Sequence, residues 1–188
     1  MIAIKEHRSW KHFEPQPGED WLNENGLDKY TQRVNKEVCN IDKSVLEQSM
    51  YKLYNYPGFK NEFSYIDFYK VDFVLEKWPN DDINNIQPPK FSGTYLDERI
   101  QALKDLGGRI EDSSYGHLKE LVKYWRQYGT WCVPIIVIKS TDFVELPFRK
   151  PYQLFEGHNR LAWAKYFINN QSDLNLAEEH AVWVIKKA

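Results

Sequence analysis

Residues 152–167 read YQLFEGHNRLAWAKYF, and the fold prediction for this chain starts from them. The first four, 152–155, are rich in aromatic and apolar side chains and predict a short strand. Gly157 permits a sharp turn, because a residue without a Cβ is not confined to the usual backbone conformations. A helix is predicted from about Asn159 by apolar residues at helical spacing, namely Leu161, Ala164 and Ile168. The stretch therefore predicts a strand, a glycine turn and a helix in succession.

Polar side chains gather where the strand gives way to the helix: Glu156, His158, Asn159 and Arg160. The first N–H groups of a helix and the positive end of its dipole favour an anion at such a place. Arginine suits a phosphate, because its guanidinium stays charged and presents a planar fork of donors. The junction is therefore predicted to be a phosphate site.

The letters EGHNR at residues 156–160 resemble the E/D-G-H-x-R signature of ParB/sulfiredoxin-like domains. The preceding segments agree in their order, with a helical pattern over 118–125, then Gly129, then the strand letters PIIV at 134–137. The resemblance covers roughly residues 93–188. It implies an α+β fold in which helices surround a small mixed β-sheet, and it leaves residues 1–92 as an aromatic-rich N-terminal extension packed on this core.

The resemblance also implies roles for the junction residues. In this superfamily the signature helix holds nucleotide phosphates, a role that falls here on Arg160 and on the backbone N–H groups of Gly157, His158 and Asn159. Glu156 would hold a divalent metal or act as a base, and His158 would donate to a phosphate or assist proton transfer. The implied ligand is a nucleoside triphosphate or diphosphate with Mg²⁺. Structural alternatives stay open, since Arg160 can pair with Glu156 and His158 can cap the helix or satisfy a carbonyl.

The chain departs from two groups within that superfamily. Sulfiredoxins carry a catalytic cysteine immediately before His-Arg in the motif, whereas Cys39 and Cys132 both lie far from residues 156–160. Sulfinic-acid reduction is therefore not expected. Chromosome-partition ParB proteins show Gly-Glu-Arg-Arg and continue into a helix-turn-helix domain, but only about twenty residues follow the signature helix here. Sequence-specific DNA binding is therefore not expected either.

Three functions remain open, and the sequence leaves undecided whether the protein is an enzyme. The first is a nucleotide- or phosphate-binding protein, either an NTP hydrolase or a phosphotransferase. The second is a non-catalytic interaction protein, such as an accessory to a mobile-element or defence system, with a protein partner on the aromatic N-terminal half. The third is a nuclease. That role is the least favoured, because 25 basic against 27 acidic residues give a net charge of −2, and nonspecific nucleic-acid affinity rests on many basic contacts.

Composition narrows the class of protein further. Hydrophobic residues make up 42% of the 188 residues, enough for a core, and most of the many aromatic side chains are expected inside it. No signal peptide or membrane-spanning apolar run is visible, which predicts a soluble cytoplasmic protein. His7 and His12 lie five residues apart without an obvious ligand partner, and we interpret them as solvated surface histidines.

The N-terminal half gives weaker patterns. Residues 43–54 predict one short helix that stops at Pro57. Residues 63–76 partly alternate between apolar and polar side chains, which predicts a strand or hairpin that bends or breaks at Asp67. Residues 79–89, PNDDINNIQPP, predict a turn-rich linker and the best internal boundary of the chain.

The C-terminal half gives stronger ones. Residues 95–106 predict an amphipathic helix that ends at the Gly-Gly pair 107–108, and no phosphate-loop motif follows that pair. A second helix over 118–125 is expected to be capped by Ser113 or Ser114. Three strands are expected in this half, at 133–138, 152–155 and 181–185.

Overall fold

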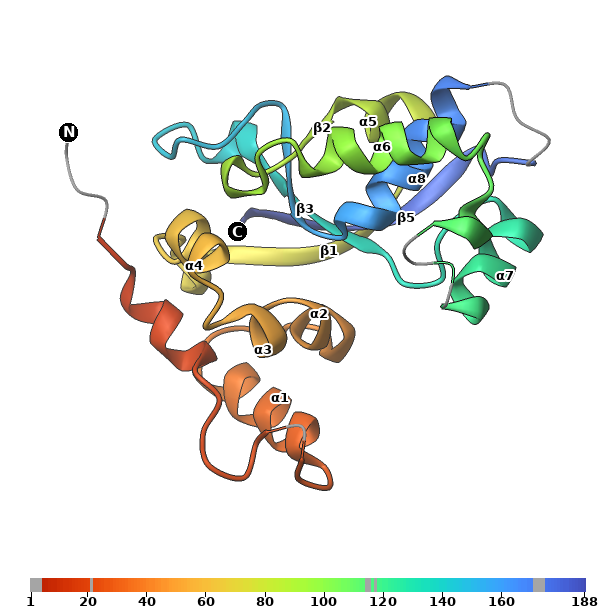
Figure 1. The fold of residues 1–188 in the computed structure, drawn as a ribbon. Helices are drawn as coiled ribbons and strands as arrows, with labels where there is room; N and C mark the ends of the chain where they lie inside the picture. Colours follow the sequence, from red (N-terminus) through yellow and green to blue (C-terminus); the bar gives the residue numbers. More distant parts are fainter. Residues whose placement is uncertain (1–4, 21, 114–115, 117, 171–174) are drawn as a thin grey trace. The chain divides into compact units, whose positions relative to one another are not determined.

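The structure is a computed structural model, and it describes residues 5–20, 22–113, 116, 118–170 and 175–188. These residues form eight α-helices, five short 3-10 turns and one five-stranded mixed sheet, so the predicted α+β fold is confirmed (Figure 1). The α-helices are α1 (Gly26–Glu37), α2 (Lys43–Gln48), α3 (Met50–Leu53), α4 (Pro57–Phe63), α5 (Asn80–Asn85), α6 (Tyr95–Asp105), α7 (Lys119–Tyr128) and α8 (His158–Asn169). The strands are β1 (Val71–Pro79), β2 (Ile86–Gln87), β3 (Ile135–Lys139), β4 (Tyr152–Glu156) and β5 (Glu179–Lys187). The 3-10 turns are η1 (Arg8–Phe13), η2 (Phe68–Lys70), η3 (Lys90–Ser92), η4 (Ile110–Asp112) and η5 (Ser140–Asp142).

The sheet has the strand order β1-β5-β3-β4-β2. β3 and β4 pair antiparallel, with Val137 opposite Leu154, whereas β2 pairs parallel to β4, with Ile86 opposite Tyr152. All three strands predicted for the C-terminal half are present as β3, β4 and β5. β3 begins at Ile135 rather than at residue 133, so the proline of the PIIV letters precedes the strand and removes no ladder hydrogen bond.

The chain forms two compact units. Unit 1 comprises residues 1–74 and 185–188, and unit 2 comprises residues 75–184. The division between the units lies between Val74 and Leu75. The boundary 92/93 between an N-terminal extension and a ParB/sulfiredoxin-like domain stays a prediction. The last residues of β5 belong with unit 1, although they are far from it in the sequence.

Unit 1 has a core of aromatic rings. Trp10 and Tyr54 stack with their ring centroids 5.6 Å apart, and Phe13 lies edge-on to Phe68 at 4.9 Å. Trp10, Phe13, Phe59, Phe63 and Phe68 have no exposed surface. The prediction that most aromatic side chains lie in a core is confirmed for these residues.

Two helix predictions in unit 1 are wrong. Residues 43–54 form two helices, because Ser49 adopts φ −120° and ψ −99°, and its hydroxyl donates to the carbonyl oxygen of Val45 at 2.5 Å. A serine that bonds back to the preceding turn competes with the helical backbone in this way. Pro57 does not stop a helix but begins α4, a position where its missing N–H leaves no bond unmade.

The strand predicted for residues 63–76 is shorter than expected. Phe63 is the last residue of α4, and β1 begins only at Val71. Asp67 does not break a strand, because no strand precedes it over the described residues 5–20 and 22–66; its carboxylate accepts from the backbone N–H of Tyr69 and caps the turn η2. The alternation was misleading because helical and 3-10 residues bury their rings in the same core as the strand.

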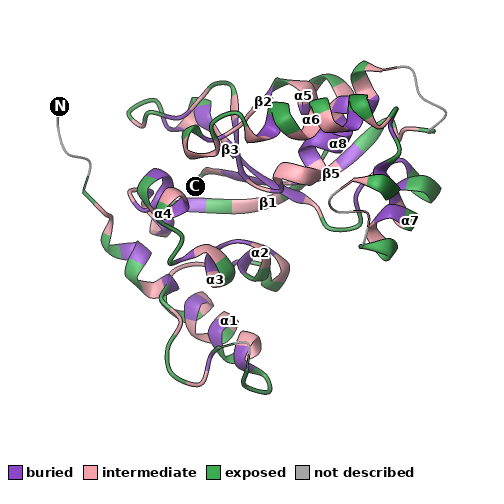
Figure 2. Ribbon diagram, in the orientation of Figure 1, coloured by how far each residue is buried: buried purple, intermediate pink, exposed green. Residues whose placement is uncertain are grey.

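Unit 2 has a core of buried apolar side chains. Figure 2 shows the buried residues in purple along β3 and α8. Four of the five residues of β3 are buried, and α8 is buried along most of its length. The linker predicted for residues 79–89 is wrong: this segment forms α5 and β2, with Ile83 and Ile86 fully buried in this core. The polar residues and prolines around these two isoleucines gave the segment the composition of a turn-rich linker.

The helix predictions of unit 2 are largely confirmed. α6 ends before Gly107 and Gly108, which have φ values of 60° and 79°, and α7 ends at Gly129 in the left-handed conformation. The capping prediction is wrong for Ser113, because α7 begins only at Lys119 after Leu118. Ser114 lies outside the described residues.

Candidate functional site

The predicted strand, glycine turn and helix are confirmed around Gly157. β4 ends at Glu156, Gly157 has φ 112° and ψ 34°, and α8 begins at His158. A Cβ on Gly157 would lie 2.5 Å from the Cγ2 of Ile135, closer than two carbons can approach. Both the positive φ and this contact with β3 require glycine at the turn.

Arg160 links the first turn of α8 to the segment before β3. One terminal nitrogen, Nη1, donates to the carbonyl oxygens of Val133 at 2.6 Å and Pro134 at 3.0 Å. The other, Nη2, donates to Oε2 of Glu156 in an ion pair. The guanidinium thus makes the internal contacts that the sequence left open as an alternative. Its role in phosphate binding, and that of Glu156 as metal ligand or base, stay predictions.

His158 is a mostly buried, neutral imidazole. Burial and the positive charge of Arg160 lower its pKa from 6.5 to about 4. Its ring lies edge-on to Phe91 and Tyr95, with centroids 6.0 and 5.8 Å away. Nε2 is buried and has no hydrogen-bond partner among the described residues. His158 therefore neither caps α8 with its side chain nor carries charge at neutral pH.

Asn159 is fixed from the neighbouring helix α6. The hydroxyl of Tyr95 donates to its Oδ1 at 3.2 Å. In the part of the chain that the structure describes, no side chain caps the N-terminus of α8. The first turn thus combines a neutral ring, an amide and an arginine with the positive end of the helix dipole.

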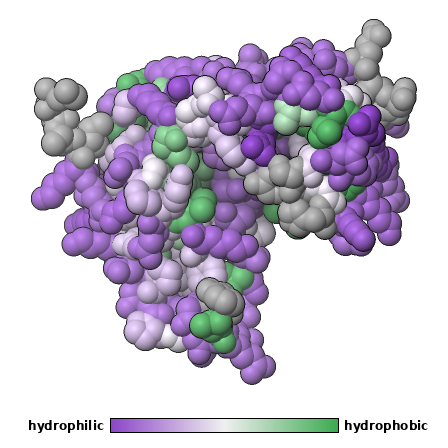
Figure 3. Space-filling model, viewed as in Figure 1, coloured by the Kyte–Doolittle hydropathy of each residue, from purple (hydrophilic) through white to green (hydrophobic). Residues whose placement is uncertain are grey.

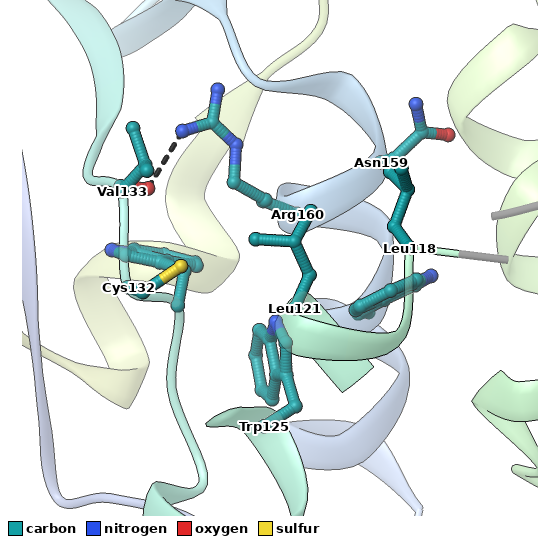
Figure 4. A pocket seen from close by; sticks show the side chains of 9 residues that line it. Leu118, Leu121, Trp125, Cys132, Val133, Asn159 and Arg160 are labelled. Atoms are coloured by element: carbon teal, nitrogen blue, oxygen red, sulfur yellow. Dashed lines mark hydrogen bonds between the residues drawn. The ribbon is translucent and has the colours of Figure 1, made fainter. Parts of the chain in front are cut away.

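An apolar cavity of about 260 Å³ opens beside this first turn (Figure 4). Asn159 and Arg160 lie at one end of it, and the guanidinium reaches across to the carbonyl oxygen of Val133. The remaining walls come from α7, from the segment before β3 and from α8, and the lining residues are Leu118, Leu121, Trp125, Trp131, Cys132, Val133, Asn159, Arg160 and Trp163. This arrangement can hold an aromatic or apolar body with a polar group at the helix N-terminus.

Sequence reasoning missed this cavity. Trp125 belongs to the helical pattern predicted over 118–125, but Trp131 and Trp163 carry no motif. The three indoles are brought together by the sheet and α8, which no local pattern encodes. The only local signal was the density of tryptophan between residues 125 and 163, which equally fits a plain core.

The sequence predicted Glu156 as a metal ligand of the site. No cluster of three or more His, Cys, Asp or Glu side chains that could hold a metal occurs within the described ranges. Glu156 directs its Oε2 at Arg160. The protein residues alone therefore do not fit a Mg²⁺ site, and a cation at this place would need the phosphate oxygens of a bound nucleotide.

Comparison of the chain with family models, with curated proteins and with solved structures found no match. The fold and the site therefore establish only the class of protein, which is an α+β protein with an apolar cavity at a helix N-terminus. The ParB/sulfiredoxin-like assignment stays a prediction. None of the helices described here is long and apolar enough to cross a membrane.

The aromatic residues of the N-terminal half are mostly interior. Within unit 1, Tyr56 is the aromatic residue with a large exposed fraction among those described, at 52%. Hydrophilic residues cover most of the face in Figure 3, with hydrophobic residues between them in smaller groups. A protein partner on this half stays a prediction, and its aromatic side chains lend it little support.

Proposed function

We propose that this protein binds a nucleotide, or another phosphate ester with a flat aromatic group, at the first turn of α8. The observation that carries the proposal is the apolar cavity beside Asn159 and Arg160. A base lies against the apolar wall of the cavity, to which Trp125, Trp131 and Trp163 contribute, because an aromatic side chain can stack on any nucleobase. The phosphate lies at the helix N-terminus, where backbone N–H groups and the dipole favour negative charge.

The cavity sets the size of what it encloses. Its volume of about 260 Å³ lies below the range of roughly 300–1,000 Å³ that is usual for whole ligands. The base therefore occupies the cavity, while the sugar and the phosphates lie at its mouth. This arrangement favours contact between the α-phosphate region and Arg160, and it leaves further phosphates in solvent.

The ion pair bears on whether the protein turns its ligand over. An NTP hydrolase or a phosphotransferase needs a base, and Glu156 is the carboxylate nearest to the turn. A carboxylate held by a guanidinium is a weaker proton acceptor, because the pair stabilises its charged form. Turnover by Glu156 therefore requires Arg160 to exchange Glu156 for the phosphate. His158, neutral at pH 7, supplies a hydrogen-bonding nitrogen rather than a charge.

Calorimetry with AMP, ADP and ATP, each with and without Mg²⁺, tests the proposal. Wild type binds, and Arg160→Ala weakens binding by about tenfold or more, since a charged hydrogen bond contributes roughly 1.5–3 kcal/mol. Glu156→Gln leaves binding nearly intact and abolishes any turnover, because an amide cannot accept the proton. Arg126→Ala is the matched control, since Arg126 pairs with Glu111 and does not line the cavity.

Protection of Cys132 from alkylation tests the location independently of Arg160. Cys132 is exposed and lines the cavity, whereas burial raises the pKa of Cys39 to about 11. Saturating nucleotide should slow iodoacetamide modification of Cys132 and leave Cys39 unchanged. Absence of calorimetric heat at millimolar nucleotide, together with unchanged modification of Cys132, would reject the proposal.

A further inference from the structure

Three side chains in unit 1 form a hydrogen-bonded triad, which ends on the phenol of Tyr69. Glu37 is the last residue of α1, His12 lies in η1, and Tyr69 lies in η2. Nδ1 of His12 is 2.6 Å from Oε2 of Glu37, and Nε2 is 2.7 Å from the hydroxyl oxygen of Tyr69. His12 is thus not the freely solvated histidine expected from the sequence. Its two ring nitrogens each have a partner.

The donor and acceptor roles in this triad follow from the carboxylate of Glu37. A carboxylate can only accept, so Nδ1 of His12 carries the proton that it shares with Glu37. In the neutral ring this leaves the lone pair on Nε2, which accepts from the O–H of Tyr69. The phenol therefore donates to a base that a carboxylate orients, which is the arrangement that activates a nucleophile.

Hydrogen bonds from neighbouring residues hold η1 and η2, the two turns that carry His12 and Tyr69. Arg33 donates to the carbonyl oxygen of His12 at 2.7 Å and makes two hydrogen bonds to the carboxylate of Glu19, at 2.7 and 2.8 Å. On the other side, the backbone N–H of Phe68 donates to the hydroxyl of Ser9 at 3.0 Å. Because Phe68 and Ser9 are fully buried, η1 and η2 are fixed relative to each other.

The three side chains are open to solvent and lie among charges of both signs, with Arg8 the cation that faces the phenol ring. The side chains of His12 and Glu37 are 33% and 38% exposed, and Tyr69 is half-buried. The guanidinium of Arg8 lies over the ring of Tyr69, 5.5 Å from its centroid, and Arg33 lies 3.5 Å from Glu37. Further charged or titratable neighbours are His7, whose ring contacts Tyr69, and the Asp67–Lys70 pair. Arg8 is exposed and gives the surroundings of the phenol a positive charge that suits an anionic substrate.

We propose that Tyr69 is the nucleophile of a second reactive site, and that its substrates are anionic esters such as phosphate diesters. The Tyr69 oxygen attacks the phosphorus, and its proton passes to Nε2 of His12. The bond from phosphorus to the leaving oxygen breaks on the side opposite Tyr69, the leaving oxygen takes a proton from water, and His12 releases its proton to solvent. The products are a phosphotyrosyl ester and an alcohol. Tyr69 and His12 are the catalytic residues, and Glu37 is a positioning residue that acts through His12.

The full chain treated with a benzenesulfonyl fluoride that carries a carboxylate tests the nucleophile. The phenol displaces fluoride from sulfur, and peptide mass spectrometry locates the sulfonate ester. Tyr69 should react about tenfold or more faster than Tyr56 and Tyr128, because a positioned base accelerates such a step. Those two residues are 52% and 50% exposed, so exposure alone predicts the opposite order. The methyl ester of the reagent, which is neutral, should react more slowly with Tyr69.

Variants of His12, Glu37 and Arg8 test the role of each residue separately. His12→Gln should slow modification of Tyr69 by about tenfold or more and leave Tyr56 unchanged. Glu37→Gln should shift the pH profile of the Tyr69 rate, because the amide no longer fixes the tautomer of His12, and Glu37→Asp should restore part of the rate. Lys36→Gln is the matched control for α1, since Lys36 is exposed. Arg8→Gln should remove the preference for the anionic reagent.

Nitrogen NMR of the wild-type protein checks the hydrogen bonds without any substitution. The neutral His12 ring should carry its proton on Nδ1, with Nε2 showing the shift of a hydrogen-bond acceptor. Modification of Tyr69 no faster than of Tyr56 would overturn the proposal, and so would an Nε2–H tautomer. Equal rates with the anionic and neutral reagents would overturn the substrate class.

Discussion

The cores of the two units are assembled from different pieces. Unit 1 gathers rings from short helices and turns that lie far apart in the sequence, as when Phe13 packs on Phe68. Unit 2 pairs continuous apolar strands, such as β3 and β4, and packs long helices on each other, such as α6 and α8. Regular elements leave a periodic trace in the sequence, whereas rings on short turns leave none. The difference explains why predictions were better for unit 2 than for unit 1.

Loss of a central ring should have the largest effect. Trp125 in unit 2 and Trp10 in unit 1 are 1% and 0% exposed, so alanine at either position should lower the free energy of unfolding by ~3–5 kcal/mol. Urea denaturation measures the loss, and hydrogen exchange should show it first in the unit that carries the change. Tyr128→Ala and Tyr56→Ala are the exposed controls. A small loss for Trp10→Ala alone would show that the ring cluster of unit 1 contributes less than the core of unit 2.

Gly157→Ala should have the next largest effect. The φ of 112° costs a residue with a Cβ about 1–3 kcal/mol, and the contact of that Cβ with Ile135 adds to this. Thermal denaturation measures the change. Gly93→Ala is the control, because its φ is also positive, at 54°, but no atom lies within 4 Å of its Cβ position. Equal destabilisation by both substitutions would show that the contact between α8 and β3 contributes nothing.

Glu19→Gln tests the charged pair that Glu19 forms with Arg33 in unit 1. Burial alone would raise the pKa of Glu19, but the hydrogen bonds from Arg33 and from the N–H of Gln16 lower it overall. Glutamine loses one acceptor of the charged pair, so we expect a loss of about 1–3 kcal/mol. The same variant should become less sensitive to acid below pH 4.5, because it lacks the depressed carboxyl. An unchanged urea midpoint would show that Arg33 finds other acceptors.

Acid should weaken unit 2 through its two buried histidines. Burial lowers the pKa of His180 to about 4, and burial with the charge of Arg160 does the same for His158. As the pH falls below 6.5, the unfolded state takes up protons that the native state does not, so stability declines between pH 6.5 and 4. The slope approaches about 1.4 kcal/mol per pH unit for each histidine. His180→Gln should reduce that slope, and a flat profile over this window would contradict the lowered pKa values.

The sequence by itself determined the regular part of the fold. The apolar run before residue 139, the glycine turn at Gly157 and the helix after it are local signals, and all three are present. The C-terminal ends of α6 and α7 also followed from glycines, which end helices whatever surrounds them. Of the candidate site, the sequence predicted the position of Glu156 and Arg160 at the junction. It left open whether they pair with each other.

Only the tertiary structure decided the rest. The hydrogen bond of Arg160 to Val133, the cavity lined by three indoles and the hydrogen bonds of His12 join residues that are far apart in the sequence, so no local pattern encodes them. α5 and β2 were missed for the same reason, since Ile83 and Ile86 become core residues only when the sheet and α8 are in place. Local propensity sets which elements form, and burial against distant residues sets which side chains meet.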